Sequence, residues 1–147
     1  MASDDMALAE KLTKRRARVC IISGIFFLAT MASSLGVDFP DSRPQTFKLA
    51  AWIVWAAALL FLLGAGGGLL RGKNVRSLMN DESTIDNRRR GMVAGFWATV
   101  LSAFALYVIT FYEPISAREV IRLLLSAAVG ASIIRFGILE QRSLGHG

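Results

Sequence analysis

The sequence predicts an all-α integral membrane protein, a four-helix bundle built from two antiparallel helical hairpins. Three observations predict this fold. Four apolar runs are each close to the ~20 residues that span a bilayer core. The hydrophobic content of 54% and the mean hydropathy of +0.48 are too high, and too concentrated in blocks, for an ordinary soluble domain. The third observation is that basic residues gather at the ends of the runs.

The four runs are apolar on all faces, whereas a helix of a soluble bundle buries one stripe and keeps its other faces polar. The chain therefore divides into an N-terminal cytoplasmic segment, residues 1–18, and a single transmembrane domain, residues 19–147. Residues 71–90 form the longest polar interval and are predicted to be the loop between the hairpins. Trp52 and Trp55 are expected to join an interfacial aromatic belt. The predicted spans are residues 19–37, 47–70, 91–112 and 117–139.

The basic residues also predict the orientation of the chain. Thirteen Lys and Arg lie in the N-terminal segment, in the 71–90 loop and at the C-terminal end, against four on the opposite side. The positive-inside rule then places both termini and the loop in the cytoplasm of a multi-pass inner-membrane protein. Because topology accounts for the net charge of +6, direct nucleic-acid binding is not expected. A signal peptide is the alternative for the N-terminus, but the first run exceeds the usual apolar length of about 7–15 residues.

The reactive side chains exclude several classes of site. Cys20 is the only cysteine and His146 the only histidine, so one chain cannot form a disulfide, a bis-histidine haem site or a histidine metal cluster. No span carries paired carboxylates or a nucleophile with a base, so an enzyme is not expected, and no cofactor is predicted.

Glu82 and Asp86 have a spacing that could hold a divalent cation. Capping and ion pairing with the nearby arginines is the preferred interpretation, and no metal site is predicted.

The third helix is predicted to begin before the membrane. Ser83 and Asp86 have the spacing of a capping box, and Asp81 and Glu82 supply the acidic residues that a helix N-terminus favours. The helix should therefore start near residues 81–84 and run about two turns through the cytoplasm. Along those turns Asp86 can reach arginines three and four residues further on.

The fourth helix is predicted to start at a second capping box, formed by Ser116 and Glu119. Glu119 and Arg122 then give this helix a charged beginning at the outer interface. Arg135 lies several positions inside the opposite end of the run, where its side chain would extend to the headgroups.

Small residues mark the predicted packing surface of the third run. They are spaced four, three, four and three residues apart, which lets another helix approach closely. This seam comprises Gly91, Gly95, Ala98, Ser102 and Ala105. The predicted partner face on the fourth run comprises Ala127, Gly130, Ala131 and Ile134.

The segment from Asn80 to Thr84, Asn-Asp-Glu-Ser-Thr, stands before Arg88, Arg89 and a Gly/Ala-rich span. It resembles small bacterial and archaeal multispanning membrane proteins of unknown function, in which an Asp-Glu-x-Thr segment precedes a transmembrane helix. The resemblance covers residues 78–98. Such proteins are often encoded beside small helix-turn-helix regulators, so the resemblance implies a membrane-bound regulatory role. Ser83 stands where a basic residue is common in that family.

The leading functional hypothesis is a non-enzymatic regulatory or scaffold module that engages a cytoplasmic regulatory protein through the 71–90 loop. Topology requires the basic residues of this loop but is largely indifferent to its carboxylates, which therefore need another role. Helix capping is the competing explanation for the carboxylates, and anionic lipid is the competing partner for the basic charges. The candidate partner-binding residues are Asp81, Glu82, Asp86, Arg88, Arg89 and Arg90.

Two alternatives remain open. The first is a small-molecule transporter that works as a dimer, because four short spans also describe the small multidrug exporters. Those exporters depend on a glutamate in the first span. Residues 19–37 contain no acidic residue, which weighs against that alternative. The other alternative is an accessory subunit whose small-residue faces dock onto a larger membrane complex.

Overall fold

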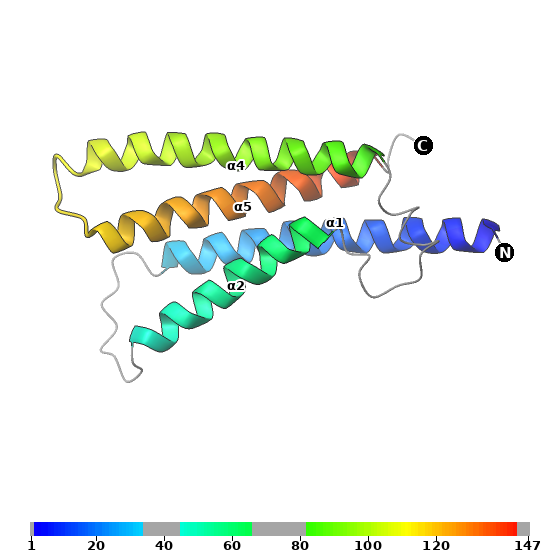
Figure 1. The fold of residues 1–147 in the computed structure, drawn as a ribbon, viewed down its shortest axis with the longest axis horizontal. Helices are drawn as coiled ribbons and strands as arrows, with labels where there is room; N and C mark the ends of the chain where they lie inside the picture. Colours follow the sequence, from blue (N-terminus) through cyan, green and yellow to red (C-terminus); the bar gives the residue numbers. More distant parts are fainter. Residues whose placement is uncertain (1, 34–44, 66–81, 144–147) are drawn as a thin grey trace.

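The computed structural model describes residues 2–33, 45–65 and 82–143, which form an all-α bundle of four helices. Successive helices run in opposite directions (Figure 1), so the beginnings of α1 and α4 and the end of α5 lie at one end of the bundle. We call this the charged end. Residues 71–81 of the predicted loop, with the candidate residue Asp81, lie outside the described part of the chain. The helices are α1 (Ala2–Ser33), α2 (Gln45–Ala65), α4 (Glu82–Ile109) and α5 (Ala117–Ser143).

The helix ends follow local sequence signals. α4 begins at Glu82, within the predicted range, but Ser83 lies inside its first turn and not at the N-cap position where the sequence placed it. The capping box at the start of α5 is confirmed. The backbone N–H of Ser116 donates to Glu119 Oε2 at 3.2 Å, and the N–H of Glu119 donates to Ser116 Oγ at 3.3 Å.

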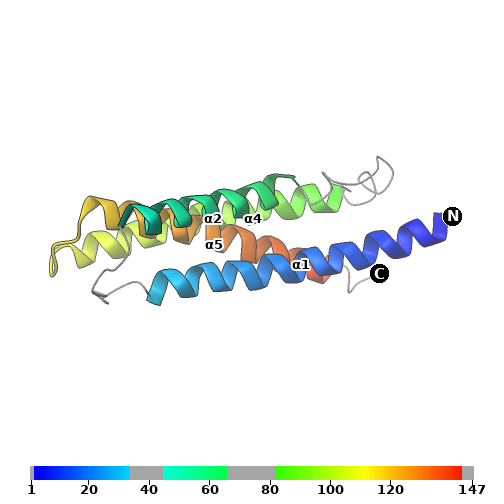
Figure 2. The same cartoon turned by 90° about the horizontal axis from the view of Figure 1, so that it is seen from below.

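α5 is the central helix of the bundle. It lies between α4 and α1 in both ribbon views (Figures 1 and 2), and α2 packs against α5 and α1. Because α5 has neighbours on several sides, small, apolar and polar side chains are buried along most of its length. Its buried residues are Ser126, Val129, Gly130, Ser132, Ile133, Phe136, Gly137 and Glu140.

The core joins α1, α2 and α5. Trp55 of α2 packs against Phe26 and Phe27 of α1, with ring centroids 5.4 and 5.7 Å apart. The indole N–H of Trp52 donates to Ser126 Oγ of α5 at 3.2 Å. Both tryptophans therefore contact neighbouring helices, and their place in an interfacial aromatic belt stays a prediction. The fully enclosed cluster comprises Cys20, Phe27, Leu59, Leu63, Val129, Ile133 and Phe136.

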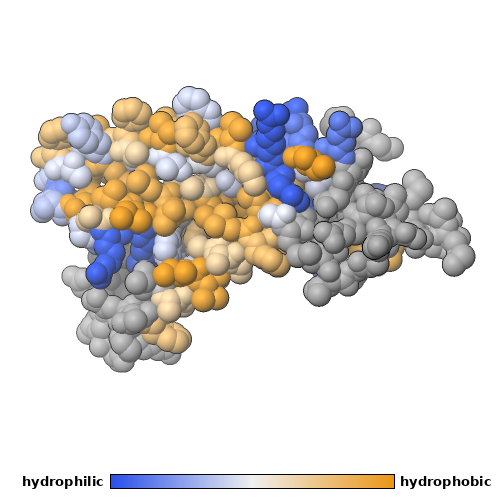
Figure 3. Space-filling view, in the orientation of Figure 1, coloured by the Kyte–Doolittle hydropathy of each residue, from blue (hydrophilic) through white to orange (hydrophobic). Residues whose placement is uncertain are grey.

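The outside of the bundle is strongly apolar. Figure 3 shows a hydrophobic face over the middle of the bundle, with hydrophilic residues gathered where α4 begins and a second group at the opposite end. α4 contributes large exposed side chains such as Phe96, Leu101 and Phe104, which are 63%, 66% and 68% exposed. Among the described helices, α4 and α5 are long and apolar enough to cross a membrane, and α2 contains a shorter apolar stretch, Ala50–Gly64.

The backbones of α4 and α5 approach closely at two glycines. A Cβ on Gly91 would lie 2.9 Å from the carbonyl oxygen of Ser132. A Cβ on Gly95 would overlap Ser132 Oγ and lie 2.6 Å from the carbonyl oxygen of Ala128. No side chain larger than hydrogen fits at either position, so these glycines set the distance between the two helices.

The other small residues of the predicted seam are less buried than the two glycines. Ala98 and Ser102 are half-buried, and Ala105 is exposed. The face of α5 that meets α4 was predicted wrongly, because the glycines of α4 contact Ala128, Ser132 and Phe136. Two residues of the predicted partner face contact α1 instead: a Cβ on Gly130 would meet Leu28, and Ile134 lies against Gly24.

We expect Gly95→Ala to destabilise the bundle by about 1–3 kcal/mol, because the added methyl group would force α4 away from α5. The midpoint of thermal unfolding of the purified protein measures this effect. Gly64→Ala is the matched control, since a Cβ on Gly64 meets no atom of the described residues within 4 Å. The control should cost nothing and could gain up to ~1 kcal/mol from helix propensity. Equal midpoints for the two variants would contradict the close α4–α5 contact.

Candidate functional site at the charged end

The first turns of α4 carry most of the candidate partner-binding residues on one short helical segment. Glu82, Asp86, Arg89 and Arg90 are exposed, and Arg88 is half-buried. Asp86 Oδ2 accepts from Arg90 Nε at 2.8 Å, a pair one helical turn apart whose side chains are 49% and 65% exposed. Arg88 Nε and Nη2 are buried without a hydrogen-bond partner among the described residues. The segment thus presents carboxylates and guanidinium groups together.

A buried ion pair lies beside this segment and joins α1 to α5. Arg16 Nε donates to Glu140 Oε2 at 2.9 Å, and Arg16 Nη2 donates to Glu140 Oε1, so the contact is bidentate. The two residues are only 6% and 1% exposed. The Arg16 guanidinium also lies 5.6 Å from the centre of the Phe136 ring, which provides a cation–π contact.

Close packing of the two backbones encloses this ion pair. A Cβ on Gly137 would lie 2.9 Å from the carbonyl oxygen of Ala17 and 3.2 Å from Cys20 Cβ. α1 and α5 therefore touch within one turn of both charged residues, and water is excluded from them. A buried pair of this kind is strongly destabilising to break, because either partner alone is a buried uncompensated charge.

Sequence reasoning missed this pair. It assigned Arg16 to the basic residues that set topology and did not single out Glu140. A signal was present in the last helix, because Ile133, Phe136, Gly137 and Glu140 recur at three, four and seven residues and so share one helical face. A carboxylate that continues a buried apolar face requires a basic partner on a neighbouring helix.

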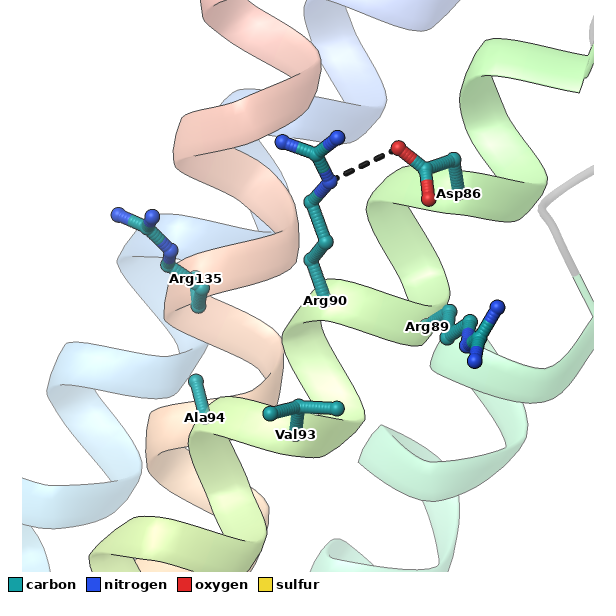
Figure 4. Close-up of a pocket in the computed structure, with 6 residues that line it drawn as sticks. All are labelled: Asp86, Arg89, Arg90, Val93, Ala94 and Arg135. Atoms are coloured by element: carbon teal, nitrogen blue, oxygen red, sulfur yellow. Dashed lines mark ion pairs between the residues drawn. The ribbon is translucent and has the colours of Figure 1, made fainter.

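A groove opens between α4 and α5 at the same end of the bundle. Its volume is about 460 Å³. Figure 4 shows Arg90 and Arg135 extending from the two helices toward the same end of the bundle, whereas Arg89 points away from Arg135. Arg135 therefore lines a charged groove together with residues of α4. The groove is lined by Asp86, Arg89, Arg90, Val93, Ala94 and Arg135.

The remaining predicted charges lie at the opposite end of the bundle. Glu119 is exposed and engaged in the capping box with Ser116. Arg122 is half-buried, and its Nε has no hydrogen-bond partner in the described part of the chain. The antiparallel fold separates both residues from Arg135, so these three charges do not form one site. Residues 2–33, 45–65 and 82–143 contain no group of three His, Cys, Asp or Glu side chains that could hold a metal ion.

We expect Glu140→Gln to lower the stability of the bundle by about 3–5 kcal/mol, because it removes the carboxylate from a buried, bidentate ion pair with Arg16. Arg16→Met should have a similar effect. The double variant Arg16→Met/Glu140→Leu should be more stable than either single variant, since it removes both buried charges. Chemical unfolding of the four proteins gives the coupling energy.

Lys14→Ala is the control for this cycle. Lys14 Nζ donates to Glu10 Oε1 at 2.7 Å, and this hydrogen bond, followed by the lysine charge, lowers the pKa of Glu10. Both side chains are more than half exposed, so the loss of the pair should leave unfolding unchanged. Strictly additive effects of the Arg16 and Glu140 substitutions would rule out the buried ion pair.

Comparison with known proteins gives no match: no family model, no curated protein and no solved structure is similar to this chain. The geometry of the bundle and of its charged end is therefore the basis for the function proposed below.

Proposed function

We propose that the chain is a non-enzymatic inner-membrane protein with four spans whose charged end lies in the cytoplasm and engages a protein partner. The apolar outer surface supports the membrane placement, because α4 and α5 are long enough to span a bilayer and expose large apolar side chains. The orientation rests on the basic residues of the N-terminal segment, the loop and the end of α5.

The observation that carries the partner-binding proposal is the charged beginning of α4. Residues 82–90 form a helical continuation of an apolar helix, and the close contacts at Gly91 and Gly95 hold that helix against α5. The orientation of residues 82–90 relative to α5 is therefore fixed. Glu82, Asp86 and Arg89 follow one another at four and three residues, so they share one face of the helix, and all three are exposed.

Such a face suits recognition of a cytoplasmic protein with complementary charges. Exposed carboxylates and guanidinium groups in a fixed order select a partner by electrostatic complementarity and repel surfaces of the wrong pattern. A uniformly basic segment would be sufficient for membrane topology. The mixture of charges on a rigid helix supports a role for the protein as a regulatory or scaffold module.

The orientation can be tested with single cysteines in a Cys20→Ala background. We expect Tyr112→Cys, whose parent side chain is 83% exposed in the α4–α5 connection, to react with an impermeant thiol reagent added to intact cells. Ser143→Cys, at the exposed end of α5, should react only after the membrane is permeabilised. Labelling of position 143 in intact cells would overturn the proposed orientation. Recovery of the protein in the soluble fraction without detergent would overturn the membrane placement.

The partner-binding face can be tested by co-purification in mild detergent. We expect Glu82→Gln/Arg89→Gln to lose a cytoplasmic protein that copurifies with the unaltered chain, because the variant removes one charge of each sign from the exposed face. Glu113→Gln/Arg118→Gln is the matched control, since it removes the same charges from exposed residues at the opposite end of the bundle. Equal retention of the partner by both variants would place the binding site elsewhere.

A second candidate function is that of an accessory subunit. An apolar groove of about 290 Å³ lies between α1, α4 and α5, and the small residues Ser102 and Ala105 line it together with Leu28 and Met31. A groove of this kind suits a helix of a larger membrane complex. This candidate would gain support if the copurifying protein were itself a membrane protein that the Glu82→Gln/Arg89→Gln variant retained.

A further inference from the structure

We propose that the groove between α4 and α5 is a binding site for the headgroup of an anionic phospholipid. The inference rests on the membrane placement in the proposed function but not on a protein partner. It assigns a ligand to Arg90 and Arg135, which the partner-binding face does not require.

The charges of the groove point to an anionic ligand. Three guanidinium groups, those of Arg89, Arg90 and Arg135, line it against one carboxylate, that of Asp86. Arg90 Nε lies 2.8 Å from Asp86 Oδ2, and the terminal nitrogens of Arg90 are directed toward the charged end (Figure 4). A phosphate group accepts hydrogen bonds from guanidinium groups with good geometry, and it would offset the repulsion between Arg90 and Arg135.

The helix contact explains why the two arginines are neighbours. Gly91 of α4 lies against Ser132 and Phe136 of α5, and these positions flank Arg135 in sequence. Arg90 directly precedes Gly91. The glycine contact therefore brings the two guanidinium groups to the same mouth of the groove, each on a rigid helix.

The surface below the groove suits the acyl chains of a lipid. Val93, Trp97, Leu101 and Phe104 follow Arg90 at helical spacing down one side of α4, and they are 50–68% exposed. The groove floor at Val93 and Ala94 connects the arginines to this apolar stripe. A lipid could place its headgroup at the arginines and its acyl chains along the exposed apolar stripe. A free phosphate would contact only the arginines. Basic pockets between transmembrane helices on the cytoplasmic side are suited to anionic headgroups.

Native mass spectrometry of the detergent-purified protein with added phosphatidylglycerol tests the inference. We expect the unaltered protein to retain phosphatidylglycerol in preference to phosphatidylcholine. Arg90→Gln and Arg135→Gln should each weaken binding roughly fivefold, and the double variant roughly thirtyfold. Arg135→Lys should keep most of the affinity because it preserves the charge. Arg118→Gln, an exposed position at the other end of α5, should bind as the unaltered protein does.

Three outcomes would overturn the inference. The first is equal retention of the two lipids by the unaltered protein. The second is wild-type retention of phosphatidylglycerol by the double variant, whose exposed substitutions should leave the thermal unfolding midpoint unchanged. The third is binding of glycerol 3-phosphate as tightly as phosphatidylglycerol, which would indicate a site for free anions. A protein that requires detergent for extraction but shows any of these results would refute only the lipid site and leave the proposed membrane placement intact.

Discussion

The contact between the backbones of α4 and α5 is the constraint on which the charged end depends. At Gly91 and Gly95 the two helices come so close that a methyl group would not fit. The contact directs the first turns of α4, and it also brings Arg90 and Arg135 to one groove. Like charges that line one groove repel each other, and the attraction between packed helices must exceed that repulsion. The arrangement of charge is thus a consequence of packing between small residues.

The ion pair between Arg16 and Glu140 makes a different contribution. A buried ion pair often adds little net stability, because the cost of desolvating both charges offsets their attraction. The ion pair does, however, strongly destabilise arrangements in which α1 and α5 pack in another register. Sliding α1 by one turn along α5 would separate the Arg16 guanidinium from the Glu140 carboxylate and leave that carboxylate buried away from its ion-pair partner. We infer that the pair sets the register of α1 on α5.

Local features of this structure could be predicted from the sequence, and long-range features could not. The four apolar runs predict the helices, and the capping box at Ser116 predicts the start of α5, because both signals act within a few residues. The face of α5 that meets α4 could not be predicted. α5 is apolar or small on several faces, so periodicity does not distinguish the side of Ser132 from the side of Gly130.

The candidate site shows the same division. Glu82, Asp86 and Arg89 were predicted to share the exposed beginning of a helix, because that arrangement depends only on helical spacing. The approach of Arg135 to Arg90 depends on how α4 and α5 are rotated against each other, and the pairing of Arg16 with Glu140 depends on the topology of the whole bundle. The helical face that ends in Glu140 signals a buried carboxylate, but no short stretch of sequence identifies Arg16 as its partner or brings Arg135 to the groove of Arg90.

The position of the ion pair also bears on how the chain assembles. Arg16 and Glu140 are 124 residues apart, so α1 receives this contact only after the far end of α5 has been made. Until α5 emerges, Arg16 lacks the Glu140 carboxylate, and α1 can bury Phe27 only against α2. Contacts between distant segments must overcome the entropy of closing a long loop, and they form late. Chains interrupted before Glu140 should therefore leave the α5-facing side of α1 exposed to quality-control proteases.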